Sequence, residues 1–191
     1  MTDPTTTPTP PAPAATPARP ATPAPRTPRI DWSLVLTLVV LGGAVLLLLA
    51  AVQPSLLVQD NTPTGGDMGA HVYAPAYLRD VLLPDLRLNG WSNDWYAGFP
   101  IYRFYMVVPA LLVLLLDLVL PYGIALKLTA VSGVLTMPIA TWAFARLARL
   151  PRPAPELLVL ASLVFLFDES FTIYGGNIAS TMAGEIGRAH V

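Results

Sequence analysis

The chain has 191 residues, of which 54% are hydrophobic and only 12% are charged, and its mean hydropathy is +0.57. Soluble domains carry about 25% charged residues, so this composition predicts that much of the chain lies in a lipid bilayer. The net charge of -1 gives no basis for a nucleic-acid partner. The absence of cysteine excludes disulfides, thiolate chemistry and zinc–cysteine sites.

Residues 1–29 are rich in proline, threonine and alanine and contain ten prolines. Such a segment has almost no apolar side chains to bury, so burial cannot offset the entropy that ordering would cost. We expect a disordered cytoplasmic tail with polyproline character, acting as a spacer. A ligand for a proline-binding module is the alternative.

The first apolar run, residues 32–52, reads WSLVLTLVVLGGAVLLLLAAV and contains no charge. About 20 apolar residues cross the hydrocarbon core as a helix. Arg19, Arg26 and Arg29 precede this run, and acidic residues follow it. The positive-inside rule therefore predicts a cytoplasmic N-terminus and places Gln53 outside.

Residues 53–121 are predicted to form an outer loop with interfacial helices. Within it, residues 71–83 have the pattern of a short helix broken near Pro75 or Pro84. Residues 104–120 are apolar but short for a crossing, and they contain Pro109 and Asp117.

The orientation of the later helices depends on residues 104–120. If that segment crossed inward, the helix at 124–147 would cross back out, and the arginines that follow it would be external. If the segment lies in the interface or re-enters from outside, those arginines (Arg146, Arg149 and Arg152) become cytoplasmic. The positive-inside rule favours this second topology. A helix at 155–171 then runs outward to an outer loop at 172–185, and it needs its last residues at the interface to reach across.

The last six residues, IGRAHV, match one DNA spelling of a common sequencing-library adapter. We expect residues 186–191 to be an artefact of that kind and the natural protein to continue beyond Glu185. Arg188 and His190 are therefore excluded from any site. The chain is also expected to be inactive by itself, because about half the helices would be missing. A genuine polar C-terminus is the alternative.

Asp67 follows Gly65 and Gly66 in the stretch GGDMGAH. One interpretation is an N-cap, in which the carboxylate accepts N–H groups at the start of a helix near Met68. The other is a general base at a lipid interface, where partial desolvation would raise its pKa. Local sequence favours the cap. His71 shares a helical face with Asp67, but two ligands without a third make a weak metal site.

The remaining polar and aromatic candidates each have two interpretations. Trp95 and Tyr96 can stack on a sugar ring or anchor the chain at the interface. Arg79, Arg87 and Arg103 can hold a substrate phosphate or lipid headgroups. Asp117 is either the wet end of a re-entrant turn, which we favour, or a buried functional acid. The stretch GGNIASTMAGE, with Asn177, is either a backbone-lined binding loop or the start of a small-residue helix.

Three stretches together carry a family resemblance: GGDMGAH, WSNDWYAGFP and FTIYGGNIASTMAGE. From Trp32 to Glu185 the chain resembles the N-terminal part of the bacterial membrane proteins called 6-pyruvoyl-tetrahydropterin-synthase-related. Those proteins look like members of the GT-C glycosyltransferase superfamily, alongside mycobacterial-type arabinofuranosyltransferases. The family label mentions pterin, but nothing in this chain points to pterin chemistry.

The resemblance implies a lipid-linked sugar donor and transfer on the outer face. Asp67 matches the acid that serves the acceptor hydroxyl, and Glu185 is a weaker match for a second acid. We assign substrate binding to His71, Arg79, Arg103, Trp95, Tyr96 and Asn177, and no residue to a metal. Asp67 lacks the acidic doublet usual at this position, so the need for a divalent cation stays open.

Together these inferences predict an all-α polytopic membrane protein, the N-terminal part of a GT-C-like helical bundle. It would be a multi-pass protein of the bacterial plasma membrane with a cytoplasmic N-terminus. Its partners would be the lipid bilayer, a polyprenyl-phosphate-linked sugar and a glycan or lipid acceptor in the envelope. The alternative is a non-enzymatic transporter or assembly subunit for envelope polysaccharide. Only Asp117 and Lys127 are candidate polar groups within the membrane, which disfavours transport.

Overall fold

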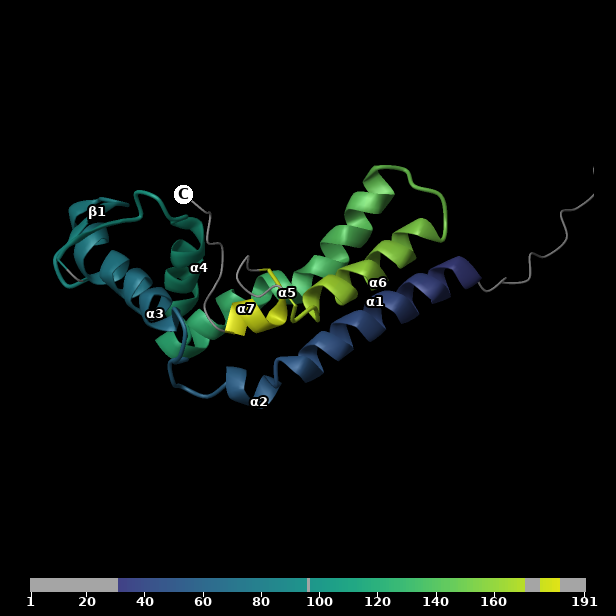
Figure 1. Ribbon diagram of the computed structural model, residues 1–191, viewed down its shortest axis with the longest axis horizontal. Coiled ribbons are helices and arrows are strands. Elements are labelled where there is room, and N and C mark those ends of the chain that lie inside the picture. The colour runs from purple at the N-terminus through teal and green to yellow at the C-terminus, as the bar shows by residue number, and fades with distance from the viewer. Residues whose placement is uncertain (1–30, 96, 171–175, 183–191) are drawn as a thin grey trace, which may run out of the picture. The chain divides into compact units, whose positions relative to one another are not determined.

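The computed structural model describes residues 31–95, 97–170 and 176–182. The chain divides into two units, Met1–Asp31 and Trp32–Val191, and all the described helices and strands belong to the second. Most described residues are helical (Figure 1), which confirms the prediction of a mostly helical chain. A two-stranded antiparallel sheet, β1 (Gly90–Ser92) and β2 (Phe99–Ile101), was not predicted. The inferences about residues 1–29 and 186–191 lie outside the described residues.

Three helices pack side by side: α1 (Trp32–Ala51), α5 (Tyr122–Leu147) and α6 (Ala154–Leu166) (Figure 1). Leu48 of α1 is fully buried against Val134 of α5 and Leu166 of α6. Thr37, near the start of α1, contacts Glu156 in the first turn of α6. Since the starts of α1 and α6 meet and their ends meet, these two helices are parallel. A short turn reverses the chain between α5 and α6, so α5 is antiparallel to both.

Helix α6 ends at Leu166, five residues before the predicted end at 171. The Asp168 carboxylate accepts hydrogen bonds from the backbone N–H and the hydroxyl of Ser170. An aspartate that bonds the backbone two residues on favours a turn over a continued helix. With 13 residues, α6 is about 20 Å long, which is shorter than the ~30 Å hydrocarbon core of a bilayer.

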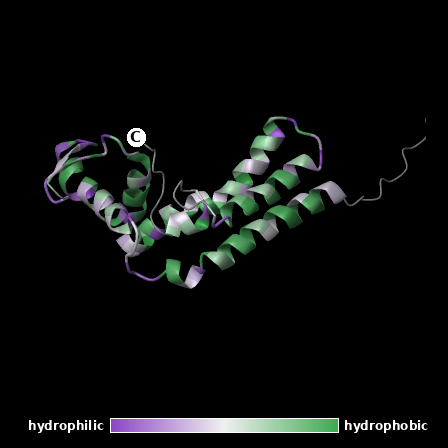
Figure 2. Cartoon of the chain, in the orientation of Figure 1, coloured by the Kyte–Doolittle hydropathy of each residue, from purple (hydrophilic) through white to green (hydrophobic). Residues whose placement is uncertain are grey.

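Two described helices, α1 and α5, are long and apolar enough to cross a membrane. Only 17% of the most apolar stretch of α1 is buried by the rest of the protein, and 33% of that of α5. The core helix of a soluble protein would be covered on most sides, and these two are not. In Figure 2 most of the ribbon of α1 and of α6 has the green of hydrophobic residues.

Lys127 of α5 fastens the segment that follows α1. Its ammonium donates to the backbone carbonyls of Leu56 (2.7 Å) and Gln59 (2.5 Å) and to the side-chain oxygen of Asn61 (2.7 Å). Leu56 belongs to α2 (Pro54–Leu57). A Cβ at Gly123 of α5 would lie 2.5 Å from the Asn61 carbonyl oxygen, so only glycine allows this approach. The chain leaving α1 is therefore held against the first turns of α5.

Lys127→Met keeps the aliphatic stem and removes all three donated hydrogen bonds. We expect a loss of roughly 0.5–1.5 kcal/mol in the free energy of unfolding, the usual net contribution of a hydrogen bond, because water can pair these exposed acceptors. Faster hydrogen exchange at the Asn61 amide, which donates to Gln59, should accompany it. Thr129→Val is the matched control, because that hydroxyl bonds only the carbonyl of Ala125 in its own helix. Unchanged Asn61 exchange in Lys127→Met would show that the lysine does not hold this segment.

The segment 53–121, which was predicted as an outer loop, contains one continuous helical stretch from Met68 to Asp85. It begins as α3 (Met68–Tyr77), widens into a π turn, η1 (Leu78–Leu82), and narrows to a 3₁₀ turn, η2 (Leu83–Asp85). Of the two predicted break points, Pro75 is wrong, because it lies inside α3 and is buried, and Pro84 is confirmed. The stretch ends just after Pro84, at Leu86, whose φ of +56° is left-handed.

Helix α4 (Val108–Asp117) packs against α3 and α5. Ala110 of α4 joins Leu78, Leu82 and Ile101 in one buried cluster. Helix α7 (Ile178–Met182) lies within the segment predicted as the outer loop 172–185. The structure therefore supports the alternative in which GGNIASTMAGE begins a helix, and Ile178 packs against the cluster of Leu48.

Candidate functional site

A cavity of about 660 Å³ lies between the loop before α3 and one face of α3. Its lining comes from residues 62–66, from Gly69, Val72, Tyr73 and Ala76 of α3, and from Tyr122 at the start of α5. The α3 positions are three or four residues apart and so lie on one helical face. Nothing lies within 4 Å of the position a Cβ would take at Gly65 or Gly69, so this part of the cavity is open.

Asp67 lies at the N-terminus of α3, directly after Gly65 and Gly66, which line the cavity. Gly65 and Gly66 have φ values of +96° and +50°, the backbone conformation that glycine adopts without strain. Asp67 occupies the N-cap position, as predicted, but its carboxylate makes no capping hydrogen bond. Its backbone carbonyl accepts from Ala70 and His71 instead. The capping hydrogen bond was therefore a wrong expectation.

Asp67 and His71 are both half-buried, one helical turn apart. Within residues 31–95, 97–170 and 176–182, no three histidine, aspartate or glutamate side chains come together as a metal site would require. The Asp67–His71 pair thus has no third ligand among these residues.

Arg79 joins three elements near the Tyr122 end of the cavity. Its guanidinium pairs with Asp80 through two nitrogens (2.7 and 3.0 Å) and with Asp117 of α4 at 2.8 Å. It also lies over the ring of Tyr122, 5.3 Å from the centroid. The hydrogen bonds from Arg79 lower the pKa of the Asp80 carboxyl. Asp117 is therefore an ion-pair partner at the end of α4, an arrangement that neither interpretation of it anticipated.

Arg79 was predicted to bind a substrate phosphate, but in the structure its guanidinium already binds two carboxylates. Two carboxylates already neutralise the guanidinium, so a substrate phosphate would have to displace one of them. Arg103 differs, because it is exposed in the turn after β2 and forms no ion pair with any residue the structure describes. Arg87 pairs with Asp85 at 2.6 Å.

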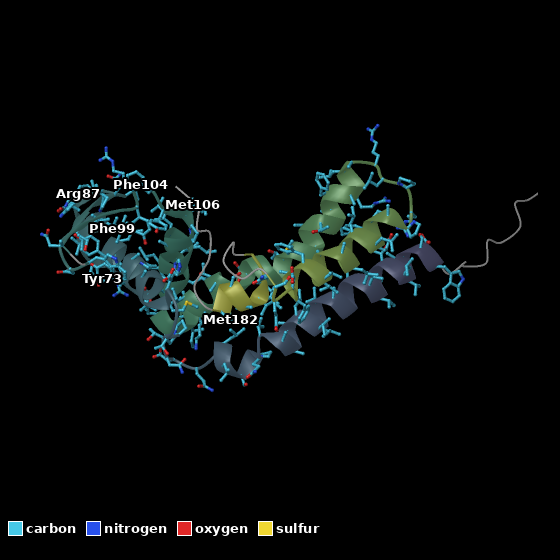
Figure 3. The ribbon with its side chains drawn as sticks, in the orientation of Figure 1. Tyr73, Arg87, Phe99, Phe104, Met106 and Met182 are labelled. Carbon is cyan, nitrogen blue, oxygen red and sulfur yellow. The ribbon has the colours of Figure 1, made fainter. Side chains whose placement is uncertain are left out.

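Tyrosine hydroxyls dock the β-hairpin onto α3. The Tyr73 hydroxyl lies 2.5 Å from the buried Ser92 hydroxyl, and it donates to Asp94 at 3.3 Å. The Tyr77 hydroxyl donates to the Trp91 carbonyl at 2.9 Å. The ring of Tyr73 stacks on Trp95, with centroids 5.7 Å apart, and Tyr73 is labelled in Figure 3. Trp95 is thus brought to the tyrosine that lines the cavity, whereas Tyr96 lies outside the described residues.

The geometry of the turn between β1 and β2 requires Gly98, the glycine of the WYAGFP motif. Gly98 has a φ of +113°, and a Cβ there would lie 2.5 Å from the Trp91 ring. Any side chain at this position would push the indole away from the turn between β1 and β2. The motif therefore shapes the hairpin that carries Trp95.

Asn177 is buried, with 2% of its surface exposed. Its side-chain oxygen accepts the Ser180 N–H at 2.8 Å, which caps α7, and its side-chain nitrogen donates to the Asp168 carbonyl at 2.8 Å. These contacts tie α7 to the end of α6, so the described contacts of Asn177 are structural. Its role toward a substrate stays a prediction, and Glu185 lies outside the described residues.

Sequence reasoning missed a buried polar pair between α1 and α6. Glu156 is 3% exposed, and Thr37 is 4% exposed. The Thr37 hydroxyl lies 2.7 Å from Glu156 Oε1, and Arg152 Nη1 lies 3.9 Å from the same oxygen. The signal was available, because a glutamate beside an apolar helix usually faces a protein neighbour rather than lipid. The pair lies where α1 and α6 begin, away from Leu48 and Leu166.

The fold and site define a mostly helical protein with two helices capable of crossing a membrane and a cavity beside an aspartate at the N-cap position of α3. No family model, no curated protein and no solved structure matches the chain.

Proposed function

We propose that the chain is the N-terminal part of an integral membrane glycosyltransferase of GT-C type in the bacterial plasma membrane, which is active when full length. It would transfer a sugar from a polyprenyl-phosphate donor to a glycan or lipid acceptor of the envelope, on the extracytoplasmic face. The observation that carries the proposal is the open cavity whose glycine-rich wall leads directly into Asp67.

The distribution of charge supports a multi-pass orientation with a cytoplasmic N-terminus. The last turn of α5 carries Arg146, and the turn between α5 and α6 carries Arg149 and Arg152. These arginines lie at the end where α1 begins, since Glu156 meets Thr37 there. The segments joined to the opposite ends of these helices carry most of the acidic residues, namely Asp60, Asp67, Asp80, Asp85, Asp94, Asp117, Asp168 and Glu169. Basic residues favour the cytoplasmic side, so the cavity would face outward.

In this proposal Asp67 takes the proton of the acceptor hydroxyl. The oxygen then attacks the anomeric carbon, and the bond from that carbon to the phosphate oxygen breaks, releasing polyprenyl phosphate. A base held in reach of the hydroxyl makes the attack effectively intramolecular. The exposed Arg103 is better suited than the paired Arg79 to stabilise the leaving phosphate. Trp95, stacked on Tyr73, would offer a flat apolar surface to the sugar ring.

Both parts of the proposal can be tested in membrane vesicles that contain the chain. Because the chain has no cysteine, single cysteines at the exposed positions Asn93 and Arg149 report orientation without background. We expect an impermeant thiol reagent to label N93C from outside and R149C only after the membrane is opened. External labelling of R149C would overturn the orientation.

Transfer is measured in vesicles that contain the full-length protein, with radiolabelled polyprenyl-phosphate arabinofuranose and polyprenyl-phosphate mannose as probes. Label moving into envelope glycan or lipid above the level of vesicles without the chain is the expected result. No transfer from either probe, with the orientation intact, would favour the non-enzymatic alternative of an envelope assembly subunit.

A further inference from the structure

Helix α4 has one face packed on protein and one face that no described residue covers. Its packed face carries Ala110 and Val113, which are 4% and 2% exposed, and it ends at Asp117, paired with Arg79. The uncovered face carries Val108, Leu112 and Leu115 and continues into Val119 in the following turn, with exposures of 71%, 38%, 62% and 80%. These positions follow the spacing i, i+4, i+7 and i+11 and so form a single stripe.

The segment leading into α4 extends this surface. Phe104, Tyr105 and Met106 immediately precede the helix and are 74%, 56% and 71% exposed, and Phe104 and Met106 are labelled in Figure 3. The ring of Tyr105 lies 6.0 Å from that of Phe99 in β2. Apolar and aromatic side chains therefore extend from Phe104 through α4, and Tyr105 reaches the hairpin at Phe99.

We infer that the uncovered face of α4 (Val108, Leu112, Leu115 and Val119) is immersed in the acyl chains of one leaflet, with α4 lying within that leaflet rather than crossing the bilayer. Ten residues make a helix about 15 Å long, roughly half the ~30 Å hydrocarbon core. The occupant is lipid because α4 packs directly on α5, one of the two helices capable of crossing a membrane. The leaflet is the one at the N-terminal end of α5, where Val113 meets Ala125 and Leu126.

The Arg79–Asp117 pair explains how α4 holds this position. Asp117 lies on the packed face, and its side chain is only 15% exposed. Neutralising it with Arg79 keeps a charge away from the lipid-facing stripe. The helix thus presents only apolar side chains to the leaflet and ends where its one acid meets a cation.

The inference rests on the membrane location in the proposed function and not on transferase activity. The test uses the full chain in lipid vesicles with single spin-labelled cysteines, L112C and L115C on the stripe and N93C as the exposed control in the hairpin loop. Collisions of each label with oxygen, which concentrates in lipid, are compared with collisions with a water-soluble nickel complex.

Labels at L112C and L115C should collide several times more often with oxygen than with the nickel complex, and N93C should show the reverse. Collision mainly with nickel at both stripe positions would mean that the face is in water, which would overturn the inference. Labels immobilised and shielded from both reagents would mean that protein covers the face, either a second copy or another segment, and would equally overturn it. If the vesicles show no sugar transfer while the labels at L112C and L115C still collide mainly with oxygen, the transferase proposal fails and this inference stands.

Discussion

Asp67→Asn is expected to lower the rate of sugar transfer by about 10²–10⁴-fold, the range that a positioned general base contributes. The amide has the size of the carboxylate but cannot accept the acceptor's proton. Asparagine is as good an N-cap residue as aspartate, and the Asp67 side chain makes no capping hydrogen bond to α3. The substitution should therefore leave the fold unchanged and reduce kcat while KM for the donor stays near its wild-type value.

Asp60→Asn is the matched control, since Asp60 is exposed and lies in the same segment, whereas Asp67 directly follows the cavity-lining Gly66. Its transfer rate should stay within about twofold of wild type, because surface substitutions away from a site cost little. Circular dichroism of both variants checks that α3 is retained. If Asp67→Asn transfers sugar at the wild-type rate, another group must activate the acceptor hydroxyl.

The long apolar helices were predictable from the sequence because hydropathy is a local property. The run at 32–52 and the helix at 124–147 each correspond to a described helix, α1 and α5, whose ends differ from the prediction by no more than two residues. Helix α6 was predicted too long, because the turn at Asp168 depends on hydrogen bonds from Ser170 to one side chain rather than on hydropathy.

The contacts that organise the candidate site were not predictable in the same way. Arg79 and Asp117 are 38 residues apart, and Tyr73 and Ser92 are 19 apart. Each of these residues, taken alone, is compatible with several roles. Only their contacts in three dimensions distinguish those roles. Pro75 shows the same limit, because a proline usually ends a helix, yet α3 continues through it with Leu78 of η1 buried beneath. The helix around Pro75 is supported by tertiary packing that local propensity does not describe.

The Thr37→Val substitution should destabilise the packing of α1 on α6 by about 1–3 kcal/mol, toward the upper end because the acceptor is a buried carboxylate. Valine has nearly the shape of threonine but has no hydroxyl to donate to Glu156 Oε1. Glu156 Oε2 is also buried and has no hydrogen-bond partner among the described residues, so losing the threonine would leave both oxygens without a hydrogen-bonded neighbour. Arg152, at 3.9 Å, is then the nearest compensating charge.

A double-mutant cycle isolates this interaction, with unfolding free energies measured by denaturant titration in detergent. In the Glu156→Gln background the carboxylate charge is gone, so adding Thr37→Val should cost less than in the wild type, with a coupling energy of about 0.5–3 kcal/mol. Thr141→Val is the matched control, because the Thr141 hydroxyl bonds only the Met137 carbonyl within α5. Equal losses for Thr37→Val and Thr141→Val would show that the hydroxyl contributes nothing through Glu156. A clear coupling would instead establish a buried polar contact that fixes α1 against α6 at the ends where both helices begin.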